Sequence, residues 1–244
     1  MVHPNAGEQP VLPTTSVSIN GTDDVALDRF KIREMCEGWP SHRDACEWEK
    51  YRALFGEDGY VFTTWSSGRH IDDFIRVSVE GFKNGDWIMH RACGVTCDVA
   101  TSGPAAGKRG LGKMKAVITQ RFMLPAQDGN GEVAVDIECD SQFWFFTYKD
   151  PKFNNDWKTN YVKLIYAKDK MIPVDPLRLP KIDRAELEKY PEGYQYLSYG
   201  QAYLGHPILM GLPERNGTAH DELYEAGAAW LKGESVKDLL HAPK

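Results

Sequence analysis

The sequence lacks several features that would assign it to a specialised class of protein. No apolar run approaches the ~20 residues that a helix needs to span a bilayer. The first sixteen residues, MVHPNAGEQPVLPTTS, contain no apolar segment typical of a secretory signal. Positive charge is also scarce, because 29 Lys and Arg stand against 35 Asp and Glu and give a net charge of −6. Because there is no basic cluster to neutralise phosphates, we do not expect the protein to bind nucleic acid. Together, these absences predict a soluble, cytoplasmic protein that does not bind a membrane.

Motifs for cofactors and metals are missing as well. The five cysteines form no CxxC pair and have no matching histidine pair, so neither a zinc site nor a disulfide framework is expected, and the thiols are expected to be reduced. No P-loop, GxGxxG, GxSxG or HExxH motif occurs. The glycine-rich segment 103–109 lacks Walker spacing and is predicted to be a loop. The sequence therefore predicts no metal and no cofactor, which leaves acid–base chemistry by side chains.

The length and composition of the sequence predict one folded domain with an additional segment at each end. Of the 244 residues, 42% are hydrophobic and 11% are aromatic, enough for a buried core. Residues 1–22 are predicted to be a flexible arm, and residues 23–170 carry the regular pattern of one domain. Residues 171–244 form a Pro- and Tyr-rich extension with a final helix over 219–232. We expect the extension to wrap the core, close the mouth of a cavity or form an oligomer interface.

Hydrophobic periodicity predicts an α+β fold for this domain. Helices are expected over residues 23–39, 44–54 and 70–82, with a break at Pro40 and Ser41. A short strand is expected over 60–65, followed by four long antiparallel strands over 87–99, 112–124, 133–148 and 157–170. This order predicts a strongly curved sheet wrapped around the N-terminal helices, with a cone-shaped cavity between them.

Complementary charges alternate along the two middle strands. The basic residues are Lys113, Lys115 and Arg121, and the acidic residues are Asp136, Glu138 and Asp140. Pairs of this kind stabilise neighbouring strands on a solvent-facing side of a sheet. We therefore interpret these residues as structural rather than catalytic.

His90 is the main candidate for chemistry. It lies in a strand among large apolar neighbours, where a titratable imidazole is costly unless it is paired or used. A core histidine bonded to a neighbour is the alternative. Asp44 could orient the imidazole, although its position before a helical run also fits a helix cap. Asp72 and Asp73 are further carboxylates, in the first turn of a helix where acids favour the helix dipole, and Gln120 must be hydrogen-bonded if it is buried.

Three segments resemble a known family. They are RDACEW at 43–48, FIRVS at 74–78 and GDWIMHRACG at 85–94, and they resemble the SnoaL-like branch of the NTF2-like superfamily, with a pattern similar to the scytalone dehydratases. The order of elements matches over residues 24–170. The resemblance implies a cone-shaped fold with a deep apolar pocket, no cofactor and acid–base catalysis on polyketide or terpenoid intermediates. It also implies a homodimer or homotrimer, unless the extension has replaced the outer sheet face as the interface.

The resemblance assigns roles position by position. The catalytic His and Asp of the dehydratases fall on His90 and Asp44. The tyrosine beside that Asp falls on Arg43, the other tyrosine falls on about Thr63, and a second His falls on about Gln120. The His–Asp pair is thus kept while the group that polarises the substrate carbonyl differs, which argues against scytalone as the substrate.

Four further expectations complete the sequence-based hypothesis. Thr63, Gln120 or Arg91 would donate hydrogen bonds to a developing enolate. The other residues expected to contact substrate are Arg43, Asp73 and Ser141. We expect a cofactor-free lyase, isomerase or cyclase that acts on a hydrophobic, oxygenated small molecule. The alternative is a non-catalytic protein of the same fold that binds a ligand or a partner protein.

Overall fold

A curled, unclosed sheet forms the centre of the structure, a computed structural model that describes residues 16–241. Its strand order is β1-β4-β5-β6-β7-β2-β3, and every neighbouring pair is antiparallel except β2 and β7. The strands are β1 (Ser16–Val17), β2 (Phe55–Thr63), β3 (Ser66–His70), β4 (Trp87–Ala100), β5 (Arg109–Pro125), β6 (Glu132–Asp150) and β7 (Asp156–Pro173). The helices are α1 (Asp23–Asp44), α2 (Trp48–Ala53), α3 (Ile71–Lys83), α4 (Arg184–Leu187), α5 (Gln195–Tyr203), α6 (Thr218–Lys232) and α7 (Lys237–Leu240).

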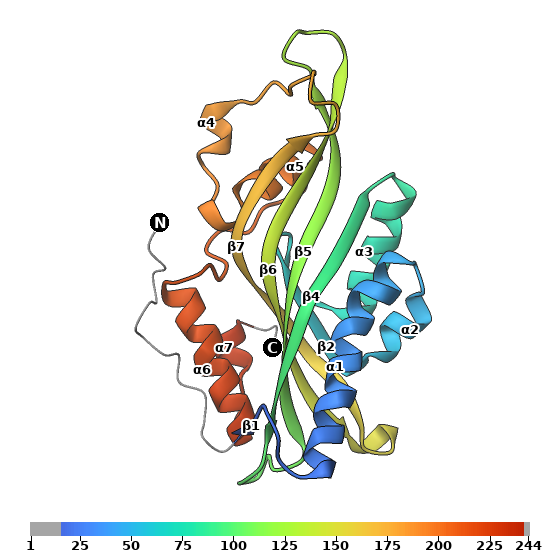
Figure 1. The fold of residues 1–244 in the computed structure, drawn as a ribbon, viewed down its shortest axis with the longest axis vertical. Helices are drawn as coiled ribbons and strands as arrows, with labels where there is room; N and C mark the ends of the chain where they lie inside the picture. The colour runs from blue at the N-terminus through green and yellow to red at the C-terminus, as the bar shows by residue number, and fades with distance from the viewer. Residues whose placement is uncertain (1–15, 242–244) are drawn as a thin grey trace.

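The helices cover both faces of the sheet. Figure 1 shows α1, α2 and α3 on one side of the long strands, with α6 and α7 on the other. Side chains alternate across a strand, so Phe143 and Phe145 of β6 pack with α1, whereas Trp144 and Phe146 pack with α6. These two apolar clusters confirm the predicted α+β architecture, in which a curved sheet wraps around the N-terminal helices.

The first helix is longer than predicted. α1 continues through Pro40 and ends at Asp44, so the expected break at Pro40 and Ser41 is wrong. A proline inside a helix costs about 3 kcal/mol. Here Trp39 and Pro40 are both buried, and the Trp39 ring lies 5.7 Å from that of Phe143. Packing of this last turn against the sheet outweighs the proline penalty.

This longer helix also changes the interpretation of Asp44. The second helix begins at Trp48 rather than at residue 44, and Glu47 precedes it as its N-terminal boundary residue. Asp44 is therefore the final residue of α1, and its interpretation as a cap of the second helix is wrong. Its carboxylate is available for a contact outside both helices.

The other predicted elements differ mainly at their ends. β1 pairs with Val99 and Ala100 of β4, so Ser16 and Val17 of the predicted arm belong to the sheet, while residues 1–15 lie outside the described residues. The sequence pattern did not predict β3, α4, α5 or α7. All five cysteines have free thiols. Among the helices of the described chain, none is long and apolar enough to cross a membrane.

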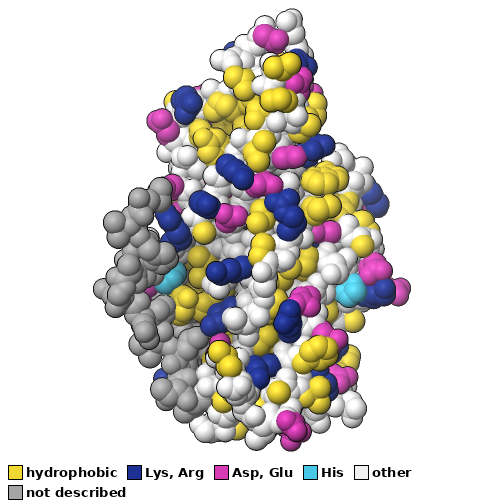
Figure 2. Space-filling model, viewed as in Figure 1, with side chains coloured by type: hydrophobic (Ala, Val, Ile, Leu, Met, Phe, Trp, Pro, Cys, Tyr) yellow, Lys and Arg dark blue, Asp and Glu magenta, His cyan; other side chains and the backbone are white. Residues whose placement is uncertain are grey.

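Cross-strand ion pairs lie on the outer face of the sheet, which is the face opposite α1, and one of them joins two of the predicted partners. The Arg121 guanidinium donates two hydrogen bonds of 2.8 Å to the Asp136 carboxylate. Lys113 pairs with Asp98 of β4, at 3.0 Å, rather than with an acid of β6. Figure 2 shows basic and acidic side chains interspersed with hydrophobic ones on the visible face.

The C-terminal extension contacts both faces of the sheet. On the side that holds α1, Gly200 of α5 leaves no room for a side chain, because a Cβ there would lie 2.8 Å from the Phe122 ring. On the opposite side, the indole N–H of Trp230 donates to the carbonyls of Gly110 and Thr147, both at 3.0 Å. The extension therefore packs against the core on two sides, with α5 beside the cavity that is described next.

Candidate functional site

His90 and Asp44 form a buried pair at the junction of α1 and β4. The Nδ1 atom of His90 lies 2.8 Å from one Asp44 carboxylate oxygen, and the backbone N–H of His90 donates to the other at 2.6 Å. The side chains of His90 and Asp44 are only 6% and 15% exposed. The register of β4 places His90 opposite Ile118 of β5, on the face that packs with α1.

The carboxylate fixes the tautomer of this imidazole. An ionised carboxylate only accepts hydrogen bonds, so we assign the ring proton of neutral His90 to Nδ1. The Nε2 atom then carries the free lone pair, and no described residue hydrogen-bonds it. His90 also lines a cavity. The pair thus places a basic nitrogen without a described partner on a residue that lines the cavity, while Asp44 binds the other ring nitrogen.

Burial sets the charge of His90. Loss of hydration lowers the pKa of the imidazole below its ordinary value of 6.5, and the positive charge of Arg43 adds to that lowering. The hydrogen bond and the negative charge of Asp44 act in the opposite direction, but burial has the larger effect. At neutral pH His90 is therefore neutral and able to accept a proton.

The inner cavity is small and mostly apolar. Its volume is about 40 Å³, room for about three water molecules at ~10–15 Å³ each. Aromatic walls come from Trp39, Trp65, Phe74, Phe143 and Tyr166, and polar groups come from Arg43, Thr63, Thr64, His90, Gln120 and Gln201. The Thr63 hydroxyl is buried without a hydrogen-bond partner among the described residues. A few polar groups thus converge within an apolar enclosure, which is typical of ligand sites.

An outer cavity of about 350 Å³ adjoins the inner one. Both cavities are lined by Arg43, Trp65, Ile88, Gln120 and Gln201. The outer cavity extends along the C-terminal half of α3 to Asp86 and His206. Burial raises the pKa of Asp86, while the charges of His206 and Arg43 oppose that rise. A ligand that enters by the outer cavity meets the shared residues before it meets His90.

A chain of side-chain hydrogen bonds holds the polar wall of the cavity. The Thr64 hydroxyl donates to Gln201 Oε1 at 2.6 Å, and Gln201 Nε2 donates to Gln120 Oε1 at 3.1 Å. The Gln120 oxygen is therefore occupied, whereas its NH₂ group has no partner among the described residues and remains a donor.

Sequence reasoning missed Gln201 because it lies in the extension. It is buried, and it follows Leu197 by four residues on the same face of α5, which was the available signal.

Arg91 is not at the site. His90 and Arg91 are consecutive in a strand and point to opposite faces, so Arg91 pairs with Glu138 on the outer face, at 2.6 Å. The expectation that Arg91 contacts an enolate is therefore wrong.

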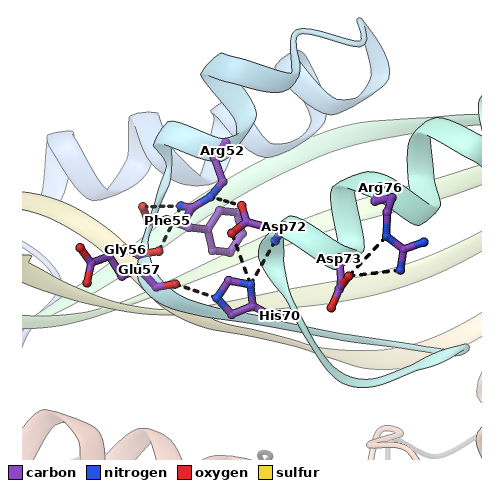
Figure 3. Close-up of polar contacts among 8 residues, drawn as sticks. All are labelled: Arg52, Phe55, Gly56, Glu57, His70, Asp72, Asp73 and Arg76. Carbon is purple, nitrogen blue, oxygen red and sulfur yellow. Dashed lines mark hydrogen bonds and ion pairs between the residues drawn. The ribbon is translucent and has the colours of Figure 1, made fainter.

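Asp73 and Ser141 are not brought to the cavities either. Figure 3 shows Asp73 turned toward Arg76 of its own helix, while the neighbouring Asp72 contacts Arg52 and His70. These carboxylates lie on the exposed side of α3 because its apolar face is the buried one. Ser141 is buried on the same sheet face as His90, but its hydroxyl donates to the carbonyl of Ala116. Neither Asp73 nor Ser141 lines the inner or the outer cavity.

The structure therefore brings together five of the eight predicted site residues. These are His90, Asp44, Arg43, Thr63 and Gln120. Within residues 16–241 no group of three or more His, Cys, Asp or Glu side chains is arranged to hold a metal ion.

Comparisons with known proteins found a matching family model and a similar protein of comparable length. A family model described as a SnoaL-like domain matches residues 24–147. Pea pathogenicity protein 2 of Fusarium vanettenii is 40% identical, over 97% of this chain and 100% of that protein.

Two solved structures, both from Novosphingobium aromaticivorans, are similar to parts of this chain. One is a protein provisionally assigned as a scytalone dehydratase, 17% identical over 67% of this chain and 94% of its own, with a TM-score of 0.45. The other is an NTF2-like protein with a cystatin-like fold, 18% identical over 62% of this chain and 85% of its own, with a TM-score of 0.38.

Proposed function

The chain belongs to the SnoaL-like domain family and has an NTF2-like, cystatin-like fold, and we propose that it is a cofactor-free lyase, isomerase or cyclase. The observation that carries the proposal is the His90–Asp44 pair, which is buried, joined at 2.8 Å and next to an apolar cavity. A core histidine with only a packing role does not need a free Nε2 beside that cavity.

His90 acts as the base in the proposed reaction. Its Nε2 atom removes a proton from a carbon next to a substrate carbonyl, and the electron pair of that C–H bond moves into an enolate. The NH₂ group of Gln120 and the hydroxyl of Thr63 are the available donors for the enolate oxygen. Asp44 holds the imidazole in the productive tautomer and offsets the charge of the imidazolium that forms.

The next reaction of the enolate determines the product. If a hydroxyl group leaves from the adjacent carbon, it takes the proton from His90 and departs as water, with formation of a C=C bond. If the proton returns to a different carbon, the product is an isomer. Attack of the enolate on a second carbonyl of the same molecule, followed by protonation of the new alkoxide, gives a cyclised product. All three outcomes use one base and one hydrogen-bonded oxygen.

The cavities bear on the type of substrate. The aromatic walls of the inner cavity suit a hydrophobic molecule, and its small volume admits only the reacting end. The body of the substrate would occupy the outer cavity. We propose an oxygenated intermediate of polyketide or terpenoid type, a cytoplasmic location, and a homodimer or homotrimer as the assembled form.

A non-catalytic binding protein is the second candidate. The observation in its favour is the narrowness of the inner cavity, where five aromatic side chains leave about 40 Å³. In that case His90 would serve only to hold a bound ligand or to join α1 to β4.

A comparison of His90→Gln with Arg91→Gln separates the two candidates. The two residues are neighbours in β4, but Arg91 lies on the outer face, so its variant is a matched control. Each protein is titrated with a panel of aromatic polyketides and terpenoids, and products are analysed by mass spectrometry. For an enzyme, His90→Gln binds the converted compound but forms product about 10²–10⁴-fold more slowly, while Arg91→Gln matches the wild type. Equal binding by all three proteins without conversion supports the binding protein.

A further inference from the structure

Arg43 is a buried cation whose side chain donates no hydrogen bond to any residue within 16–241. It lies in the last turn of α1, its side chain is 4% exposed, and it lines both the inner and the outer cavity. Its guanidinium carbon lies 5.8 Å from the centre of the Phe74 ring and 5.4 Å from that of Phe82. The two rings hold the planar group in place without hydrogen-bonding it.

The neighbouring carboxylate does not satisfy this guanidinium. The nearest approach to Asp44 is 3.6 Å, from Nη1 to Oδ1, which is beyond hydrogen-bonding distance. Both Asp44 oxygens already accept hydrogen bonds from His90. The Nε and Nη1 atoms of Arg43 have no hydrogen-bond partner among the described residues. Buried N–H groups of a charged side chain are rarely left unpaired in proteins, so an ordered water or a ligand in the adjoining cavities must complete them.

The shape of the group limits what that ligand can be. A guanidinium presents its N–H donors in a planar fork that matches the two oxygens of a carboxylate. Arg43 lines both cavities and interacts electrostatically with His90. An anionic group bound there lies next to the imidazole that the proposed function uses as its base.

We propose that Arg43 binds a carboxylate of the substrate, so that the substrate class is an oxygenated carboxylic acid rather than a neutral ketone. The inference rests on the proposed function for the reaction, and Arg43 adds the specificity for the anion. The carboxylate occupies the boundary between the two cavities, while the carbon that loses its proton faces His90. Binding of the acid supplies the hydrogen bonds that Arg43 lacks in the protein alone.

Matched probes separate the role of Arg43 from that of His90. The probes are 4-acetylbenzoate and 4-acetylbenzamide, which share an acidic methyl group next to a ketone and differ in the charge of the para substituent. Binding is measured by calorimetry, and exchange of the methyl protons in D₂O is measured by NMR. The variants are Arg43→Met, which keeps an unbranched stem between the two rings, and Arg43→Lys, which keeps the charge but loses the fork. His90→Gln and Arg91→Met are the controls.

We expect the wild type to bind the acid about tenfold more tightly than the amide, as charge-assisted hydrogen bonds predict. Arg43→Met removes that preference, and Arg43→Lys reduces it and serves as the test if Arg43→Met does not fold. His90→Gln keeps the preference but loses the accelerated exchange, and Arg91→Met keeps both. Equal binding of the two probes by the wild type, or binding of neither, overturns the role of Arg43. If the wild type exchanges the methyl protons but binds both probes equally, only the inference about Arg43 is overturned. If it binds the acid more tightly but does not exchange the methyl protons, only the acid–base proposal is overturned.

Discussion

Asp44 accepts two hydrogen bonds from His90, one from the backbone N–H at 2.6 Å and one from Nδ1 at 2.8 Å. The two residues are 46 positions apart, so this double contact joins the end of α1 to the start of β4. The backbone bond fixes the carboxylate relative to the strand, and the side-chain bond then fixes the plane of the imidazole. One residue thus serves both the fold and the candidate site.

Asp44→Asn is expected to change the tautomer of His90. The two donors of His90 approach different oxygens of Asp44, and an asparagine replaces one of these oxygens with an NH₂ group, which then faces a nitrogen that previously donated. We expect neutral His90 to carry its proton on Nε2, with proton abstraction slower by about 10²–10⁴-fold. Ring ¹⁵N shifts measure the tautomer without any substrate. Asp73→Asn, on the exposed side of α3, is the control, and an unchanged tautomer in Asp44→Asn would contradict the assignment.

His90 should titrate below its ordinary pKa of 6.5, because burial disfavours the charged ring. Below that lowered pKa the imidazole is protonated and cannot accept a proton, so catalysis declines as the pH falls through it. An NMR titration of the ring protons gives the pKa, and the pH profile of methyl exchange should show an acid limb at the same value. A midpoint above 6.5 would contradict the dominance of burial.

The same shift predicts how stability depends on pH. Between the lowered pKa of folded His90 and 6.5, the unfolded chain binds the proton more readily than the folded chain. The contribution of His90 to the free energy of unfolding is therefore constant above pH 6.5 and declines as the pH falls through this window. Urea unfolding at pH 7.5 and 5.5 should show a larger loss of stability for the wild type than for His90→Gln. Equal losses would mean that His90 has the same pKa in both states.

Gly227→Ala is expected to destabilise the protein although it replaces a helical glycine. In an exposed helix this change stabilises by roughly 1 kcal/mol. At position 227 of α6, however, the new Cβ would lie 2.9 Å from the Trp144 ring and 3.0 Å from Leu111. We expect a net loss of about 1–3 kcal/mol in thermal or urea unfolding. Ala228→Gly, at a partly exposed neighbouring position, reports the helix propensity alone, and a stabilised Gly227→Ala would mean that α6 is not docked as described.

Local sequence patterns correctly predicted the features that follow from the alternation of side chains along a strand. Alternation along β5 and β6 predicted the outer ion pair between Arg121 and Asp136, and the apolar setting of His90 marked it as a candidate. Local sequence patterns gave wrong predictions where contacts between distant parts of the chain determine the structure. Pro40 predicted a break that the burial of Trp39 overrides. Arg91 was expected to donate a hydrogen bond to an enolate, but it follows His90 directly, and consecutive strand residues face opposite sides of a sheet.

Gln201→Leu tests whether the extension organises the cavity, a contact that no local pattern could predict. The substitution removes the acceptor for Thr64 and the donor to Gln120, so two buried polar groups each lose a hydrogen bond. We expect a loss of about 1–3 kcal/mol in unfolding free energy. We also expect weaker binding of ketone probes, because Gln120 is then free to turn its NH₂ group away from the cavity. Gln127→Leu, in an exposed turn beyond β5, is the control for loss of an amide. If Gln201→Leu destabilises the protein but leaves ketone binding and proton exchange intact, the hydrogen-bond chain supports the fold and not the site.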